Sequence, residues 1–243
     1  MEVTVLGCNG LYPANGINTS GYLIRANQDN IVFDMGSGVF SELKQIMRPE
    51  KVSAIFISHL HHDHIADLGV YNYYLEALSR NGQFSGKIKL LIAKDESAVY
   101  RLIEGLNYFE IVNVSDGETF YLNTLTFSFY KTAHPVYTLG TTLFDGQKTL
   151  GYTADGNLCD NFIHIVGKSD LCVCHAPFSN EEWSSLKAHV SAKIACKIAK
   201  EKGTKIVISH LLPDRDNSSV IEEGLKEDPN ALFAMQGKTY NVG

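Results

Sequence analysis

The chain has 243 residues, of which 44% are hydrophobic and 20% charged. This length suits one large globular domain, so we expect residues 1–243 to form a single domain. Only 6 prolines accompany 20 glycines and no low-complexity tract occurs, which excludes a disordered chain. The net charge of −6, without any run of Lys and Arg, excludes a broad basic surface for nucleic acid.

The sequence contains no apolar run near the roughly 18 residues that a membrane span needs. It opens with a strand-like pattern rather than a basic leader before an apolar stretch. These features predict a soluble cytoplasmic protein with no membrane partner. The five cysteines are scattered and odd in number, and two of them alternate on the apolar run 171–174. We expect inert core thiols rather than a redox or metal role.

Short β-type runs follow one another along the chain. They lie at residues 3–6, 22–25, 31–34, 54–58, 88–92, 125–130, 141–144, 149–153, 171–174 and 206–209. Apolar residues at steps of three or four predict helices at 65–78 and around 194–198. The pattern predicts a strand-rich α/β domain in layers, with the helices outside.

One short internal echo suggests two related halves. The segment Ile57-Ser58-His59-Leu60 is matched by Ile208-Ser209-His210-Leu211, and each follows a β-branched run. The runs 31–34 and 150–155 both end in Asp. Either the matches are chance, or two pseudo-symmetric βα halves bring four strand ends to one edge.

The most specific signal is the segment His59-Leu60-His61-His62-Asp63-His64. A chance match to this pattern is expected on the order of once in a thousand such chains. In an extended segment, residues two apart face the same way, so His59, His61 and Asp63 project together. We expect His64 to start the 65–78 helix, where the positive dipole end keeps imidazole neutral and able to bind metal. These ligands exceed what one tetrahedral ion takes from a single loop, which predicts two metals.

With this segment, the chain resembles the metallo-β-lactamase superfamily. The family pattern is an Asp that ends an early strand, the His-x-His-x-Asp-His loop, and then a distant His, Asp and His at strand ends. The chain supplies Asp34, the 59–64 loop, His134, Asp155 and His210 in that order. The resemblance implies an αβ/βα four-layer sandwich with a dinuclear site at one edge of two sheets.

The resemblance also implies a role for each residue. One metal ion would be held by His59, His61 and His134, and the other by Asp63, His64 and His210, with Asp155 as the bridge. Asp34 would lie behind the ligands and brace the metal loop. The cofactors would be two divalent metal ions, zinc in the first place and manganese as the alternative. A hydroxide shared by such ions is nucleophilic near neutral pH, which implies hydrolysis, with Asp63 also among the catalytic residues.

Within the superfamily, three features resemble ribonuclease Z. They are the glycine-containing opening at 7–13 with Asn18-Thr19-Ser20, the spacing from His64 to His134, and the segment 188–192. That segment implies that His189 contacts the scissile phosphate or protonates the leaving group. With an ordinary pKa near 6.5 it would hold a proton part of the time at neutral pH. The alternative is a surface histidine at a helix N-terminus.

Two departures from ribonuclease Z disfavour tRNA as a partner. Only 21 positions separate His134 from Asp155, too few for the family's flexible tRNA-binding arm. In Cys174-His175-Ala176-Pro177-Phe178, His175 replaces the family's glutamate that orients the active-site histidine. Arg215 would be a phosphate contact or a solvated loop charge.

Several other histidines and tyrosines could bind metal or a nucleobase, but the sequence favours a structural role for them. We expect His62 to face solvent or lie behind the ligands and His164 to pack rather than bind metal. We expect the tyrosines of the 65–78 helix to line the core and an interface rather than stack on a base. These are Tyr71, Tyr73 and Tyr74.

The sequence therefore predicts a metal-dependent hydrolase, a phosphodiesterase related to ribonuclease Z, that acts on a small phosphodiester or a short nucleic acid. The alternative is a hydrolase of a β-lactam, thioester or sulfate ester with the same site. An idle metal-binding module is disfavoured because the whole ligand set is intact. The sequence is compatible with a homodimer.

Overall fold

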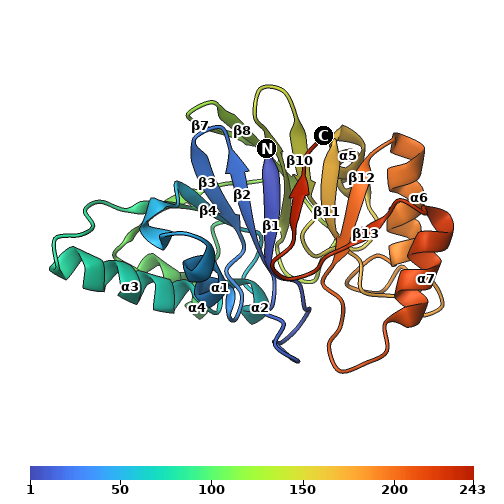
Figure 1. Cartoon of the computed structure of the whole chain (residues 1–243), viewed down its shortest axis with the longest axis horizontal. Helices are drawn as coiled ribbons and strands as arrows, with labels where there is room; N and C mark the ends of the chain where they lie inside the picture. Colours follow the sequence, from blue (N-terminus) through green and yellow to red (C-terminus); the bar gives the residue numbers. More distant parts are fainter.

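The computed structural model describes residues 1–243, and two seven-stranded sheets face each other at its centre (Figure 1). The first sheet has the order β14 (Thr239–Asn241), β1 (Glu2–Gly7), β2 (Gly21–Ala26), β3 (Asp29–Phe33), β4 (Ala54–Ile57), β5 (Ile88–Ile92), β6 (Phe109–Asn113). The second has the order β13 (Leu232–Phe233), β12 (Lys205–Ser209), β11 (Leu171–His175), β10 (Thr149–Tyr152), β9 (Leu139–Phe144), β8 (Leu125–Lys131), β7 (Thr119–Leu122).

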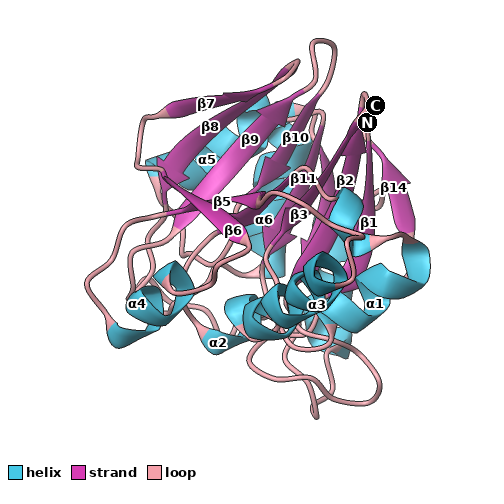
Figure 2. Cartoon of the chain, turned by 90° about the vertical axis from the view of Figure 1, so that its left-hand side faces the viewer, coloured by secondary structure: helices cyan, strands magenta, loops and turns pink.

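Helices cover the outer faces of both sheets (Figures 1 and 2). On the first sheet lie α1 (Val39–Ile46), the 3-10 turn η1 (Pro49–Lys51), α2 (His62–Ile65), α3 (Leu68–Arg80) and α4 (Ala98–Glu104). On the second lie α5 (Asp160–Lys168), α6 (Ala192–Lys202) and α7 (Ser218–Glu227). This arrangement confirms the predicted αβ/βα four-layer sandwich. No helix combines the length and the apolar character that crossing a bilayer requires.

Three apolar clusters hold these layers together. The largest has 27 buried residues between the two sheets, and the other two, of 19 and 15 residues, lie between each sheet and its helices. Central strands such as β4 and β11 are buried along their whole length because both faces are covered. Their sequences are correspondingly continuous apolar runs. In β8 only alternate residues are buried, and it reads as an alternating strand.

The two sheets repeat one pairing scheme. In the first, β1, β2 and β3 pair antiparallel, and β3 to β6 continue in parallel. In the second, β8, β9 and β10 pair antiparallel, and β10 to β13 continue in parallel. The scheme therefore matches β4 with β11, which ends at His175. The sequence echo matched β4 with β12 instead, so it points to the right edge but to the wrong pair of strands.

All ten predicted strands are confirmed, to within two residues at each end. The four strands that the sequence analysis missed are β6, β7, β13 and β14, and these are the four edge strands of the two sheets. Edge strands are short or half exposed, so their sequences lack the continuous apolar run of a central strand. The predicted layered architecture is correct without these four strands, because an edge strand widens a sheet and adds no new layer.

The predicted 65–78 helix is wrong at its start. Tertiary backbone hydrogen bonds interrupt it, since the Met35 N–H donates to the His64 carbonyl and the Asp67 N–H donates to the Met35 carbonyl. The four-residue α2 therefore holds His64, and α3 begins separately at Leu68. His64 does not lie at the N-terminus of a long helix, so the helix dipole does not set its protonation.

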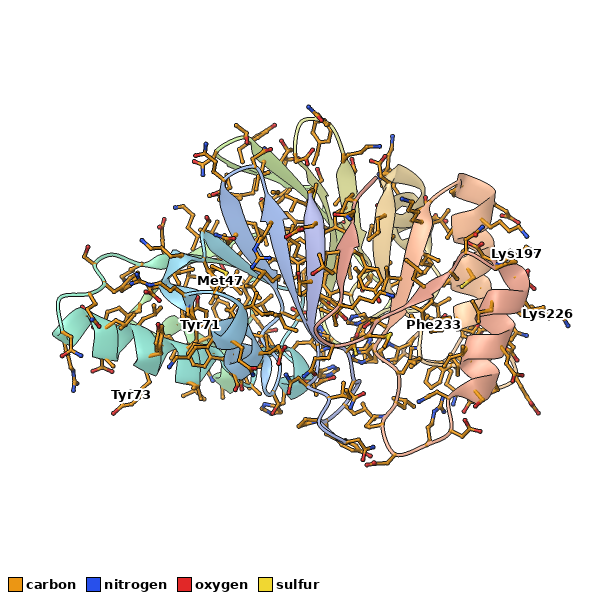
Figure 3. All side chains as sticks on the ribbon, in the orientation of Figure 1. Met47, Tyr71, Tyr73, Lys197, Lys226 and Phe233 are labelled. Carbon is orange, nitrogen blue, oxygen red and sulfur yellow. The ribbon has the colours of Figure 1, made fainter.

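The tyrosines of α3 differ in burial. Tyr71 is fully buried and donates to the Pro49 carbonyl, whereas Tyr73 is 68% exposed and points outward from α3 (Figure 3). Tyr73 therefore does not line the core.

All five cysteines are free, and burial raises the pKa of Cys8 to about 11 and that of Cys196 to about 12. Such thiols are unreactive, in agreement with the expected inert role.

Candidate metal centre

Five strands end at the same edge of the two sheets, the lower edge in Figure 1, where α2 is drawn. The residues at or just after these ends are Asp34 (β3), His59 (β4), Asp155 (β10), His175 (β11) and His210 (β12). All five are buried. Parallel strands present their carboxyl ends at one edge, which explains how residues far apart in sequence meet there. The predicted convergence of strand ends is confirmed.

The first group of candidate ligands consists of His59, His61, His134 and Asp155, whose ligand atoms all lie within 4.8 Å of one another. His59 Nε2 lies 2.9 Å from His61 Nδ1, and His134 Nε2 lies 3.3 Å from the same atom. Asp155 Oδ2 lies 3.5 Å from His59 Nε2 and 3.8 Å from His134 Nε2. Three imidazoles and one carboxylate thus face a common point.

The second group lies on the other side of Asp155. His64 Nε2 lies 3.5 Å from Asp155 Oδ2, and His210 Nε2 lies 3.6 Å from Asp155 Oδ1. Asp63 Oδ2 lies 3.6 Å from His64 Nε2 and 3.7 Å from His210 Nε2. The structure therefore brings all seven predicted ligands together, with Asp155 between the two groups.

The outer nitrogens of these histidines are already engaged. His64 Nδ1 donates to Asp34 Oδ2 at 2.7 Å, and His134 Nδ1 donates to the Ala188 carbonyl at 3.2 Å. His210 Nδ1 lies 2.9 Å from Ser20 Oγ, and His59 Nδ1 lies 3.0 Å from Ser58 Oγ. Such contacts fix the ring and its tautomer and leave the inner nitrogen with a lone pair.

The inner nitrogens of His64 and His210 are buried and have no hydrogen-bond partner. A buried polar atom without a partner costs about 1–3 kcal/mol. A bound cation removes that cost, and imidazole with carboxylate is a donor set that divalent transition metals accept. The residues present therefore fit the predicted metal ions.

Protonation also suits metal binding. Burial lowers the pKa of His59 and His61, and it lowers the pKa of His210 to about 3. Burial acts to raise the pKa of Asp155, but the nearby histidines, His210 first, outweigh it and hold that pKa well below 3.8. These groups are thus neutral imidazoles and an ionised carboxylate at neutral pH, the forms that ligate metals.

His64 is the exception among the histidines. Burial acts to lower its pKa, but Asp155 and Asp34 outweigh burial and raise the pKa well above 6.5. The expectation that a helix N-terminus keeps His64 neutral is therefore wrong. The two carboxylates thus favour the doubly protonated ring of His64 in the metal-free protein, and a metal ion at Nε2 must displace that second proton.

Asp34 lies behind the ligands, as the resemblance implied. Its carboxylate accepts from the Ser58 N–H and the Ser58 hydroxyl, each at 2.8 Å, as well as from His64 Nδ1 and the Tyr152 hydroxyl. Its backbone has φ 57°, a left-handed conformation that a non-glycine residue rarely adopts. The contacts join Asp34 to the start of the metal loop and to one ligand.

His189 is buried, with 7% of its surface exposed, so the alternative of a surface histidine is wrong. Its Nε2 lies 3.9 Å from Asp155 Oδ2, and its ring centre lies 5.1 Å from that of His210. Its Nδ1 has no partner, which agrees with the absence of the family's orienting glutamate. Burial lowers the pKa of His189 to about 4. The expectation that it holds a proton part of the time at neutral pH is therefore wrong.

His175 is the residue that sequence reasoning undervalued. The sequence marks it only as a replacement for a glutamate, yet its Nδ1 lies 2.7 Å from Asp155 Oδ1. His175 therefore contacts the central carboxylate Asp155, whereas the family's glutamate would contact the residue at the position of His189. The signal that could have found it is its place at the end of β11, the strand that corresponds to β4 in the repeated pairing scheme.

Other candidates lie outside the two groups. Arg215 donates to the Pro177 carbonyl and to Glu182, so it ties two loops together. His62 is exposed, as expected. His164 is exposed on α5, with its ring centre 4.9 Å from that of Tyr130, so it packs against an aromatic ring and is no ligand.

The stretch between His134 and Asp155 contains a tight hairpin. Strands β9 and β10 occupy most of it and pair antiparallel. No extended arm lies there, as the spacing predicted.

Known proteins resemble this chain over nearly its whole length. The family model of the anti-Pycsar protein Apyc1 matches residues 1–240. The probable metallo-hydrolase YhfI of Bacillus subtilis is 30% identical over 87% of this chain and 87% of its own length. The uncharacterized protein Rv1339 of Mycobacterium tuberculosis is 28% identical over 97% of this chain and 89% of its own length.

Solved structures agree. The crystal structure of the metallo-β-lactamase fold protein YhfI from Bacillus subtilis has a TM-score of 0.91 at 28% identity and covers 98% of each chain. The short form of human tRNase Z has a TM-score of 0.77 at 18% identity over 100% of each chain, which shows the shared fold. Two shared features, the fold and the whole-length sequence match, support the same assignment. The chain belongs to the family of the anti-Pycsar protein Apyc1, and it shares the metallo-β-lactamase fold of its metallo-hydrolase relative YhfI.

Proposed function

We propose that the chain is a phosphodiesterase that uses two divalent cations, zinc or manganese, to hydrolyse small phosphodiesters. The observation that carries the proposal is the position of Asp155. Its Oδ2 faces His59 and His134 of the first group as well as His64 of the second, and its Oδ1 faces His210. A carboxylate placed between two groups of neutral imidazoles suits a bridge between two ions.

Divalent ions held there would supply Lewis acidity and lower the pKa of water. The chain's own residues set the geometry. The Leu11 N–H donates to Asp63 Oδ2 at 2.9 Å and fixes that carboxylate against the second group. Gly36 permits the close packing of this loop, because a Cβ there would lie 2.1 Å from the Asp63 carbonyl oxygen.

Two imidazoles beside Asp155, those of His175 and His189, lie outside the two ligand groups. His175 contacts the carboxylate at hydrogen-bond distance, whereas His189 Nε2 lies 3.9 Å from Asp155 Oδ2. A neutral ring with its proton on Nε2 can donate a hydrogen bond to a phosphate oxygen. Its low pKa favours this contact over proton transfer to the leaving group at neutral pH. We therefore assign His189 to phosphate binding.

Small substrates fit the proposal better than tRNA. The net charge is −6, and the hairpin of β9 and β10 stands where ribonuclease Z carries its arm. Affinity for a long nucleic acid depends on many phosphate contacts from basic residues. We propose a small phosphodiester or a short nucleic acid as the substrate, and slow processing of precursor tRNA.

The test compares substrates side by side on metal-loaded protein: bis(p-nitrophenyl) phosphate, nitrocefin, a thioester, a sulfate ester and a precursor tRNA. We expect turnover of the diester and two metal ions per chain by elemental analysis. His61→Ala should lose turnover together with one of the two metal ions, while His62→Ala, an exposed neighbour in the same motif, should keep turnover and both ions.

Other outcomes would contradict specific parts. Preferred cleavage of nitrocefin, the thioester or the sulfate ester would support the alternative hydrolase. Bound metal without any turnover would support an idle module. One ion per chain would contradict the dinuclear centre, and efficient cleavage at a tRNA 3′ end in physiological salt would contradict the size limit.

A further inference from the structure

A row of buried hydrogen bonds runs from Asp155 through His175 to Tyr22 and Ser209. His175 also offers a ligand atom within 4.8 Å of those of His64 and His210. His175 Nδ1 lies 2.7 Å from Asp155 Oδ1, His175 Nε2 lies 2.8 Å from the Tyr22 hydroxyl, and that hydroxyl lies 2.7 Å from Ser209 Oγ. None of the four residues is more than 2% exposed. Tyr22 belongs to the first sheet and the other three to the second, so the row crosses between the sheets.

The direction of donation in this row is fixed. The ionised Asp155 can only accept, so His175 donates through Nδ1–H. A neutral imidazole then has a lone pair on Nε2, which accepts from the Tyr22 hydroxyl. The Tyr22 oxygen in turn accepts from the Ser209 hydroxyl. Every member therefore has one consistent role. A proton on His175 Nε2 instead of Nδ1 would leave Asp155 without a donor from His175.

The ring of His175 is also held by packing. It stacks on the ring of His210, with centres 4.5 Å apart and an angle of 15° between the planes, and the edge of Tyr152 lies against it. Asp155 itself follows Ala154, which has a left-handed backbone with φ 52°. Asp155 thus lies at a sharp turn after β10. A hydrogen-bond partner there restricts the rotation of the Asp155 side chain.

We infer that His175 is a positioning residue, which uses its Nδ1–H and its support from Tyr22 to fix the rotation of the Asp155 carboxylate. In this rotation Oδ2 faces His59, His134 and His64, and Oδ1 faces His210. The inference rests on the proposed two-ion function, because only a bridging carboxylate needs both oxygens aimed. Nothing in it requires His175 to touch metal or substrate. If Asp155 rotated, either His210 or the pair of His59 and His134 would lose its shared oxygen.

Three variants separate positioning from simple packing. His175→Leu removes both polar contacts, whereas His175→Asn keeps an N–H donor near the Nδ1 position. Tyr22→Phe keeps the ring and removes only the distant hydroxyl. The matched control is Tyr71→Phe, which removes another buried tyrosine hydroxyl, the donor to the Pro49 carbonyl, far from Asp155.

The main readout is zinc affinity, measured on the full chain without substrate by competition with a chromophoric chelator. Loss of a contact to a ligand typically costs 10- to 100-fold in metal affinity, and we expect about that loss for His175→Leu. His175→Asn should recover most of it, and Tyr22→Phe should show a smaller loss. Tyr71→Phe should lower thermal stability but keep wild-type zinc affinity. In the metal-free protein, nitrogen NMR should find the His175 proton on Nδ1.

The inference is overturned if folded His175→Leu binds zinc like the wild type, or if the His175 proton is on Nε2. If His175→Leu does not fold, Tyr22→Phe decides, and a zinc loss no greater than that of Tyr71→Phe overturns the inference. A wild-type chain that takes up no zinc overturns it as well. A chain that binds zinc but cleaves no phosphodiester contradicts the proposed function alone, because these readouts use no substrate.

Discussion

The two halves of the candidate metal centre are built in different ways. The first sheet supplies four candidate ligands from the single segment 59–64, directly after β4. The second sheet supplies His134, Asp155 and His210, which lie on three separate loops, and it adds His189 from a fourth. The first half needs only one strand and one loop to take shape. The second half exists only when β8 to β12 are paired in register, so it depends on the whole sheet.

Each half is nevertheless braced by the other sheet. The Tyr152 hydroxyl, from the second sheet, donates to Asp34 in the first. The Tyr22 hydroxyl, from the first sheet, donates to His175 in the second. The two tyrosine ring centres lie 5.4 Å apart in the core between the sheets. The two halves are thus coupled through their supports, and the following variants test how far the difference between them extends.

The largest effect is expected at Asp155, which both ligand groups share. Asp155→Ala should lose both metal ions and lower kcat/KM by about 1000-fold or more, because each bound ion lowers the activation barrier by several kcal/mol. His61→Ala removes a ligand of one group only and should keep one ion. Elemental analysis with kinetics checks both. If Asp155→Ala retained two ions, the carboxylate would not join the halves.

The next effect is expected at His189 in the second half. His189→Ala should keep both metal ions and lower turnover by about 100-fold, a loss within the usual range for a removed active-site donor. The loss should be similar for a diester with a poor leaving group and for a p-nitrophenyl diester, because a phosphate contact serves both. His189→Gln, which offers an N–H near the Nε2 position, should recover part of the activity. A loss confined to the poor leaving group would instead indicate proton donation.

A smaller effect is expected from the brace of the first half. Asp34→Asn weakens the acceptor that holds Ser58 and His64, and it should reduce zinc affinity by about 10- to 100-fold. Tyr152→Phe, which removes one of its several donors, should cost less. Chelator competition measures both. Unchanged zinc affinity in Asp34→Asn would show that the segment 59–64 keeps its shape without the brace.

The smallest effect concerns acid stability of the metal-free protein. The folded pKa values of His189, about 4, and His210, about 3, lie below the unfolded value near 6.5. The unfolded chain therefore binds more protons below pH 6.5, and stability falls as pH drops from there toward 3. His64, with a raised pKa, has the opposite sign: its stabilisation is present below pH 6.5 and is lost as pH rises through its folded pKa.

We expect the two lowered histidines to outweigh His64, so urea unfolding should give a lower free energy of unfolding at pH 5 than at pH 7. His189→Phe removes one titrating group and should make the difference smaller. Cys174→Ser, a buried change in β11 at a residue that is no candidate ligand, should leave the pH dependence unchanged. A larger free energy of unfolding at pH 5 would show that His64 dominates.

The sequence by itself determined the layers and half of the centre. Continuous apolar runs marked the central strands because those strands are covered on both faces, and the segment 59–64 was visible because its ligands are contiguous. The distant ligands His134, Asp155 and His210 were found through a family pattern. Short-range periodicity could not have grouped them, since it carries no information on which strands pair.

Only the tertiary structure decided the rest. It replaced the long 65–78 helix by α2 and α3 through backbone bonds to Met35, and it raised the pKa of His64 through carboxylates from two sheets. It buried His189 and lowered its pKa, and it placed His175 against Asp155. Each outcome depends on desolvation or on partners at least twenty residues away in the chain. Such effects arise when strands pair and layers pack, and no local window of sequence contains them.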